Sequence, residues 1–291
     1  MILVSGATGH LGASIIAQLR KHAPAGSFAA LARNPDKAAA LSAAGIEVRQ
    51  GDYDHPHTLS GAFAGVRTLM FISSMSLERT AQQAAVVDAA VRAGVDHIVY
   101  TGLAIADIQR SATQAVMASH FQTEQHIIES GVGYTFLRNT MYAEALPAIL
   151  GSPAVPHTIA LNAGTGRVPF ALRRELGEAA ANVLLQPGHR GKTYHLTGAH
   201  ALSFADVAAE LSHISGHAVR YTPIDANTLR AGLTQAGLPG FMVDLTVGTL
   251  DDIQQGQYEI ASTDLATLLG RKPASPHAVL NEVFDSAANT P

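Results

Sequence analysis

The first 140 residues alternate between short apolar runs and segments with helical spacing. Runs of apolar residues predict strands at 2–5, 27–32, 68–72 and 97–100, and the alternation of apolar and charged residues predicts a further strand at 46–49. Apolar residues on one helical face predict helices at 11–20, 35–44, 57–64 and 81–93. Most of the strands are apolar throughout, which is typical of strands buried on both faces. We therefore predict an α/β fold with a doubly wound parallel sheet of the Rossmann type.

The alternation weakens after residue 140, where Pro147, Pro153 and Pro156 crowd around Gly151. We therefore predict a Rossmann-like domain over residues 1–140 and a smaller C-terminal domain over residues 141–291. Within the second part, residues 174–186 predict a helix and 193–197 a strand, so we expect 173–198 to pack back onto the first sheet. Further helices are expected near 204–215 and 263–270, on either side of a stretch rich in glycine and proline.

A glycine-rich loop joins the first strand to the first helix with the spacing Gly-x-x-Gly-x-x-Gly. Glycines permit a tight turn and a close backbone approach, and a helix N-terminus offers N–H groups to a pyrophosphate. This context predicts a dinucleotide cofactor. The candidate cofactor-binding residues are Gly6, Ala7, Thr8, Gly9, His10, Leu11 and Gly12. A purely structural turn is the alternative.

The end of the second strand indicates which dinucleotide is bound. An NAD site needs an acidic residue about 20 residues after the loop, to hold the ribose 2′-hydroxyl. This chain has Arg33 at that point, and a guanidinium can pair with a 2′-phosphate. We therefore expect NADP(H) as the cofactor. Asp52, after the third strand, either faces the adenine amino group or closes its own turn.

Composition excludes several classes of catalytic site and binding partner. The chain has 291 residues, a formal net charge of -4 and no cysteine. The absence of cysteine excludes thiolate catalysis and cysteine-based metal sites, and the histidine spacings match no metal motif, so we expect no metal. No basic tract interleaved with aromatics indicates nucleic acid. No apolar run approaches about 18 residues and no basic leader is present, so we expect a cytoplasmic protein without membrane contact.

Six segments in order resemble the NmrA-like group of atypical short-chain dehydrogenases. They are 6–12 (GATGHLG), 31–35 (LARNP), 51–53 (GDY), 71–74 (FISS), 120–124 (HFQTE) and 134–139 (YTFLRN). Residues 162–166 and 268–271 fit later segments of the group, so the resemblance spans essentially the whole chain. Within the group the chain is most similar to bacterial NADPH:quinone oxidoreductases and triphenylmethane dye reductases. His10 departs from the glutamine usual in the loop.

The resemblance implies direct hydride transfer from NADPH to a flat, conjugated acceptor, in a cleft between the two domains. It also implies that Ser73, Ser74 and residues 137–142 line the nicotinamide side, which adds Arg138 and Asn139 to the cofactor contacts. Gly164 to Arg167 would close over the cofactor.

Many reductases of this architecture use a tyrosine with a lysine four residues later, and no tyrosine here has one. A quinone tolerates this absence, because its reduced anion is stabilised and solvent can protonate it, whereas a ketone needs a matched acid. His120 and Glu124 stand one helical turn apart. Either His120 orients substrate or supplies a proton, with Glu124 fixing its tautomer, or the two are a packing pair.

Three residues are candidates for substrate binding. Asn139 and Tyr142 follow a strand at the expected cleft, although a strand-end asparagine often only satisfies backbone groups. Phe241 lies in an apolar stretch that either lines the cleft or packs in the C-terminal domain.

The favoured function is an NADPH-dependent reductase of quinones or similar small conjugated molecules. A non-catalytic NADP(H) sensor of the NmrA type and an imine, dye or enone reductase are the alternatives. A homodimer is compatible with the sequence.

Overall fold

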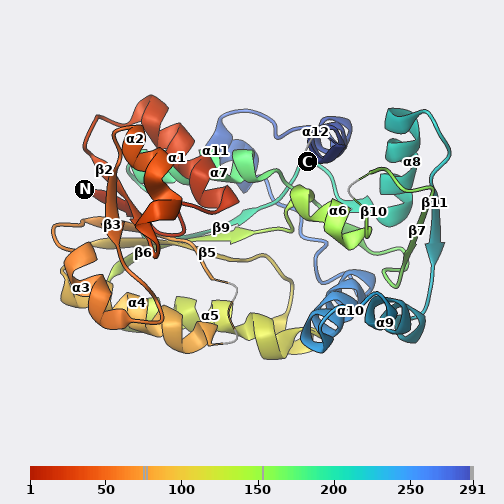
Figure 1. Ribbon diagram of the computed structural model, residues 1–291, viewed down its shortest axis with the longest axis horizontal. Helices are drawn as coiled ribbons and strands as arrows, with labels where there is room; N and C mark the ends of the chain where they lie inside the picture. Colours follow the sequence, from red (N-terminus) through yellow and green to blue (C-terminus); the bar gives the residue numbers. More distant parts are fainter. Residues whose placement is uncertain (75, 77, 153, 289–291) are drawn as a thin grey trace.

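The structure is a computed structural model that describes residues 1–74, 76, 78–152 and 154–288. A seven-stranded, fully parallel sheet has the order β3-β2-β1-β4-β5-β6-β9 (Figure 1). Its strands are β1 (Ile2–Val4), β2 (Phe28–Ala32), β3 (Glu47–Gln50), β4 (Thr68–Phe71), β5 (His97–Leu103), β6 (Gly133–Asn139) and β9 (Lys192–Leu196). The predicted doubly wound parallel sheet is confirmed, and the strand order reverses between β1 and β4.

Helices cover both faces of this sheet (Figure 1). One face carries α1 (His10–His22), α2 (Ala39–Ala43), α7 (Arg173–Leu185) and α11 (Asp264–Leu269). The other carries α3 (Leu59–Ala62), α4 (Arg79–Arg92) and α5 (Gln114–Glu129). Each layer buries a separate apolar cluster, with Ile15 and Leu176 in the first and Val86 and Ile127 in the second. Burial on both faces explains why most of the strands show no alternation of polar and apolar residues.

The rest of the chain packs beside the carboxyl ends of the strands, around a third apolar cluster. Its helices are α6 (Leu146–Ile149), α8 (Phe204–Ser215), α9 (Ala226–Gln235), α10 (Gly240–Gln254) and α12 (Pro276–Ala288). Two short sheets pair β7 (Thr158–Leu161) with β11 (Arg220–Pro223) and β8 (Arg167–Val168) with β10 (Leu202–Ser203). Within the described residues, no helix combines the length and the apolarity needed to cross a bilayer.

The segment from α7 to β9 returns to the large sheet. Strand β9 pairs with β6, and helix α7 packs against α1. The two helices approach closely because Gly177 faces Ser14: a Cβ at Gly177 would lie 2.6 Å from the Cβ of Ser14. The sheet therefore takes its last strand from beyond the proline-rich stretch that follows β6.

The segment between β5 and α5 is tied to α10 by a buried carboxylate. Asp252 accepts hydrogen bonds from the hydroxyls of Ser111 (2.6 Å) and Thr113 (2.9 Å) and from the backbone N–H of Ala112 (2.6 Å). The backbone N–H of Asp107 donates to Gln257 Oε1 over 2.9 Å. These bonds fix the C-terminal region against the edge of the sheet where the strands end.

Candidate dinucleotide site

The glycine loop forms a cradle at the start of α1. Gly6 has a φ of 58°, a left-handed conformation that favours glycine. A Cβ at Gly12 would lie 2.1 Å from the carbonyl oxygen of Gly6, so the helix can pass this close only without a side chain. Gly9 precedes the helix, and among the described residues no side-chain cap bonds its first N–H groups. Such a free helix N-terminus suits an anionic pyrophosphate.

The loop side chains divide between core and surface. Ala7 and Leu11 are buried in the apolar cluster beneath α1, so only their backbone can contact a ligand. Thr8 and His10 are exposed, in keeping with a position where the backbone rather than the side chain meets phosphate. The loop is thus packed against the core on one side and exposed on the other.

A pocket of about 670 Å³ runs from this loop across the ends of β1, β2, β3 and β4. Its lining includes six of the candidate residues: Gly6, Thr8, Arg33, Asp52, Ser73 and Ser74. The pocket lies where the strand order reverses, which is the place at which open α/β sheets bind ligands. Its glycine cradle and polar rim fit a dinucleotide.

Two cations stand at the far end of this pocket, beyond β2. Arg33 and Lys37 both line it and both are exposed. Lys37 was missed by the sequence analysis, although its place four residues after Arg33, in a helical turn opened by Pro35, is a usable signal. The carboxylate of Asp54 lies 3.9 Å from Arg33. No acidic residue occupies the end of β2, so the donor set suits a phosphate better than a bare ribose.

Asp52 serves its own turn while lining the pocket. Its Oδ1 accepts the backbone N–H of Asp54 over 3.1 Å, and its Oδ2 lies 3.2 Å from Nδ1 of His55. Its backbone N–H donates to the hydroxyl of Thr58. These hydrogen bonds show that Asp52 closes its own turn. A contact between Asp52 and the adenine amino group stays a prediction.

Two serines after β4 are held by neighbouring strands and helices. The backbone N–H of Ser73 donates to the Thr101 hydroxyl over 2.9 Å. The Ser74 hydroxyl donates to Gln82 Oε1 over 3.3 Å, and Gln82 also bonds Asp54. This chain of contacts links the β4 end of the pocket to the end that carries Arg33.

His120 and Glu124 do not form the pair considered from the sequence. The ring of His120 is buried between Nη1 of Arg79 (3.3 Å) and the hydroxyl of Tyr100 (3.2 Å). Glu124, also buried, instead receives two hydrogen bonds from Arg138, at 3.0 and 2.5 Å. The expectation that Glu124 fixes the tautomer of His120 is wrong in this geometry, because the guanidinium of Arg138 takes the carboxylate.

The hydrogen bonds to Glu124 also determine where the side chain of Arg138 lies. Its guanidinium pairs with Glu124 and lies 4.9 Å from the centre of the Phe121 ring. A Cβ at Gly102 would lie 2.6 Å from Glu124 Oε1, so the glycine makes room for this ion pair. The guanidinium is therefore held beside α5 and does not line the dinucleotide pocket.

Asn139 and Tyr142 meet beyond the end of β6. Asn139 is 4 % exposed, and its Nδ2 donates to the Tyr142 hydroxyl over 3.4 Å. The Arg173 guanidinium lies 4.6 Å from the centre of the Tyr142 ring. Burial raises the pKa of Tyr142, and the Asn139 hydrogen bond and the charge of Arg173 partly offset this.

Two further candidates lie in the C-terminal region. Gly164 has a φ of 53°, and a Cβ there would lie 3.1 Å from Cγ of Gln254 at the end of α10. Gly164 does not line the dinucleotide pocket. Phe241, at the start of α10, is 47 % exposed rather than packed into the third cluster. An exposed aromatic ring is compatible with a cleft wall and not with a core position.

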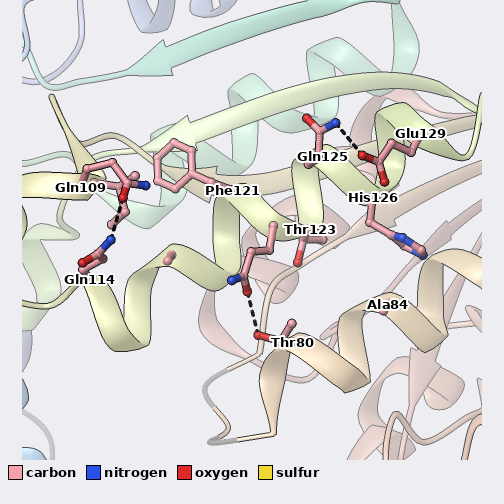
Figure 2. Close-up of a pocket in the computed structure, with 12 residues that line it drawn as sticks. Thr80, Ala84, Gln109, Gln114, Phe121, Thr123, Gln125, His126 and Glu129 are labelled. Atoms are coloured by element: carbon pink, nitrogen blue, oxygen red, sulfur yellow. Dashed lines mark hydrogen bonds between the residues drawn. The ribbon is translucent and has the colours of Figure 1, made fainter.

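A separate cavity of about 550 Å³ lies on the outer side of α4 and α5. Figure 2 shows its lining, in which Gln109 bonds Gln114 and Gln125 bonds Glu129. The amide of Gln122, which also lines the cavity, bonds the Thr80 hydroxyl. Each of these amide groups bonds a neighbouring side chain, and no candidate site residue lines the cavity. Across the described ranges, no group of three or more His, Asp or Glu side chains is placed to hold a metal ion.

Residues 1–245 match the NmrA-like family. The chain belongs to this family. Quinone oxidoreductase 2 of Escherichia coli is 36% identical over 98% of this chain and 99% of its own length. The structure of the E. coli NADPH-dependent quinone oxidoreductase in complex with NADPH superposes with a TM-score of 0.89, covering 99% of this chain and 100% of that one at 35% identity.

Two further relatives have other names. The structure of Citrobacter sp. triphenylmethane reductase complexed with NADP(H) has a TM-score of 0.87 and 37% identity, covering 97% of this chain and 99% of that one. The NAD(P)H azoreductase of Xenophilus azovorans is 31% identical over 84% of both chains. The family resemblance inferred from the motifs is confirmed.

Proposed function

We propose that this protein is an NADP(H)-dependent reductase that delivers two electrons directly to a quinone or a similar flat, conjugated acceptor. The observation that carries the proposal is the pocket at the reversal of strand order, with a glycine cradle at one end and Arg33 and Lys37 at the other. The relatives named as quinone, azo and triphenylmethane reductases support the acceptor class.

The pocket residues would hold the cofactor as follows. The backbone of the loop from Gly6 to Gly12 would bind the pyrophosphate, with the N-terminus of α1 as its positive end. Arg33 and Lys37 would bind the 2′-phosphate, which NAD lacks. Ser73 and Ser74 would border the nicotinamide half. When bound, NADPH supplies the hydride, and the chain's own groups position the acceptor and exclude water.

The acceptor class follows from the proton donors that the chain offers. The tyrosine–lysine pair is missing, and the pKa of His120 is lowered to about 3, first by desolvation and then by the charge of Arg79. Neutral His120 accepts from Arg79 and is a poor acid near neutral pH. Acceptors whose reduced anion is stabilised, such as quinones, therefore suit the site better than simple ketones.

Absorbance of NADPH, followed with a panel of quinones, azo dyes and triphenylmethane dyes, tests the proposal. We expect oxidation of NADPH that depends on a quinone and that is slower with NADH. Simple aliphatic ketones should be reduced far more slowly than quinones. Binding of NADPH without turnover on any acceptor would favour the sensor function instead. Failure to bind either coenzyme would overturn the proposal altogether.

A further inference from the structure

Tyr142 lies just beyond the end of β6, outside the lining of the dinucleotide pocket. Its ring packs against the apolar cluster that also contains Ala7 of the loop, and Ile72 of the pocket wall packs against the same cluster. It follows β6, and its backbone pairs with Ala171 just before α7. The phenol therefore stands at the carboxyl edge of the sheet, on the β6 side of the reversal between β1 and β4, where the reacting half of a dinucleotide is expected.

The hydroxyl of Tyr142 is an acceptor in its one described hydrogen bond. Nδ2 of Asn139 donates to it over 3.4 Å, so its own hydrogen stays available for another partner. The Oδ1 atom of Asn139 is buried, and among the described residues it has no hydrogen-bond partner. A buried acceptor left in this way destabilises the fold, unless a bound molecule supplies a donor. Both groups thus offer hydrogen bonds to something that the folded chain does not itself provide.

A cation is held against the face of the Tyr142 ring. The guanidinium of Arg173 lies 4.6 Å from the ring centre. Glu144 fixes this arginine, because Oε1 accepts its backbone N–H over 2.8 Å and Oε2 lies 3.5 Å from Nη1. A cation over the ring and an N–H donor to the oxygen both stabilise a phenolate. These contacts act in the same direction as a lysine beside a tyrosine, although burial leaves the pKa of Tyr142 raised.

We propose that Tyr142 is the general acid of the reaction, with Asn139 and Arg173 as positioning residues that stabilise its phenolate. The inference rests on the proposed function. The acceptor would receive its hydrogen and both electrons as the hydride that bound NADPH supplies. The Tyr142 O–H bond then breaks, and its proton forms an O–H bond to the anionic oxygen of the reduced acceptor. Water returns a proton to the half-buried phenolate, so one proton from solvent is consumed per turnover.

This assignment predicts that the need for Tyr142 differs from one acceptor to another. A quinone with a weakly basic reduced anion needs little help, because solvent protonates it readily. An acceptor with a strongly basic reduced anion needs an acid at the moment of reduction. Tyr142 would therefore widen the range of acceptors rather than being needed equally for all of them.

The groups that face the phenol set its protonation. Burial raises the pKa of Tyr142, and Asn139 and Arg173 lower it, while Glu144 raises it. The phenol is thus protonated near neutral pH and ready to donate. Removing the guanidinium in Arg173→Met should raise the pKa of Tyr142 further, whether or not the protein turns over.

The test compares Tyr142→Phe with Tyr194→Phe, which removes another half-buried phenol whose hydroxyl is bound to His189. On acceptors with basic reduced anions, kcat of Tyr142→Phe should fall by about 100-fold, the lower range for general acids. On acceptors with weakly basic anions it should change less than about threefold. Binding of NADPH, measured by fluorescence, should stay unchanged, and Tyr194→Phe should behave as the wild type.

A second readout does not depend on activity. 3-Fluorotyrosine at position 142 reports the ionisation of the phenol by fluorine NMR, and Arg173→Met should move that titration to higher pH. If the wild type reduces acceptors but Tyr142→Phe loses kcat equally on all of them, or only raises KM, this inference is wrong and the proposed function stands. If the wild type reduces none of them, the proposed function fails. If the NMR titration of residue 142 is the same in the wild type and in Arg173→Met, the proposed coupling between Arg173 and Tyr142 is wrong.

Discussion

Arg79 Nη1 lies 3.3 Å from Nε2 of His120, so the histidine ring must accept at that atom. A guanidinium has no acceptor, which makes it the donor in this contact. The ring's other nitrogen, Nδ1, lies 3.2 Å from the hydroxyl of Tyr100, which donates to Gln83 Oε1 over 3.1 Å. Neutral His120 is therefore built into a buried chain of hydrogen bonds, at a site that protonation would disrupt.

This arrangement predicts that His120 destabilises the fold in acid. Its pKa is about 3 in the fold and about 6.5 in the unfolded chain, so the unfolded state binds more protons below pH 6.5. The stability that depends on neutral His120 is complete above that value and is lost as the pH falls. At pH 5 the loss amounts to about 2 kcal/mol.

Urea unfolding at pH 7.5 and pH 5 measures this effect in the wild type and in His120→Gln. We expect the wild type to lose up to about 2 kcal/mol more than the variant over this interval. Other histidines with lowered pKa values, such as His97, His189 and His195, are present in both proteins and cancel. Equal losses in the two proteins would show that His120 is not held neutral.

How far the sequence predicts this protein differs between its two parts. The large sheet was predictable because its strands are buried runs such as 68–72 and because glycines mark the first turn. Helices α9 and α10 lie in a stretch where Gly232, Gly237 and Pro239 suggested irregular structure. They form because Asp225 caps α9 and because apolar side chains such as Val247 of α10 are buried in the third cluster.

The candidate site, like the fold, was predictable from the sequence only in part. Arg33 and the loop glycines could be predicted as site residues from the sequence, since their spacing along the chain alone places them beside one another. The partners of His120 and Glu124 were not predictable, because Arg79 lies 41 residues before His120, and Arg138 comes from the next strand. Helical spacing shows which residues share a face, but it does not show which residue of another element reaches them first.

Glu124 is predicted to support the fold rather than the chemistry. Its carboxylate is buried and paired with Arg138, so Glu124→Gln should leave a partly buried guanidinium without its charge partner. We expect a loss of about 3 kcal/mol in the free energy of unfolding. Glu129→Gln, on the exposed side of the same helix, is the control and should change stability by less than about 0.5 kcal/mol. If Glu124→Gln keeps wild-type stability while kcat falls, Glu124 belongs to the reaction instead.

Arg33 is predicted to select NADPH over NADH. Arg33→Asp replaces a cation by an anion at the end of β2, so KM for NADPH should rise by at least about 30-fold while KM for NADH changes less than about threefold. Asp54→Asn is a matched test, because Asp54 lies 3.9 Å from Arg33. Both groups are exposed, so this change should lower KM for NADPH by no more than about threefold. Equal effects of Arg33→Asp on both coenzymes would contradict the assignment.

Gly12 is predicted to be essential for the cradle, for a steric reason that can be isolated. In Gly12→Ala the new Cβ would lie 2.1 Å from the Gly6 carbonyl oxygen and 2.8 Å from the Ala7 Cα, and both are backbone atoms. The loop or the helix must therefore shift, at a cost of about 1–3 kcal/mol in stability. Because the same backbone is expected to bind pyrophosphate, affinity for NADPH should fall more than about tenfold.

Gly61→Ala provides the control for this change. Gly61 lies on the exposed side of α3, where a Cβ would meet nothing within 4 Å. Alanine is the better helix former there, so this variant should be more stable by about 0.5–1 kcal/mol. Fluorescence titration with NADPH and thermal unfolding of both variants separate a damaged cradle from a general effect of the added methyl group. Wild-type affinity for NADPH in Gly12→Ala would mean that the dinucleotide does not rest on this loop.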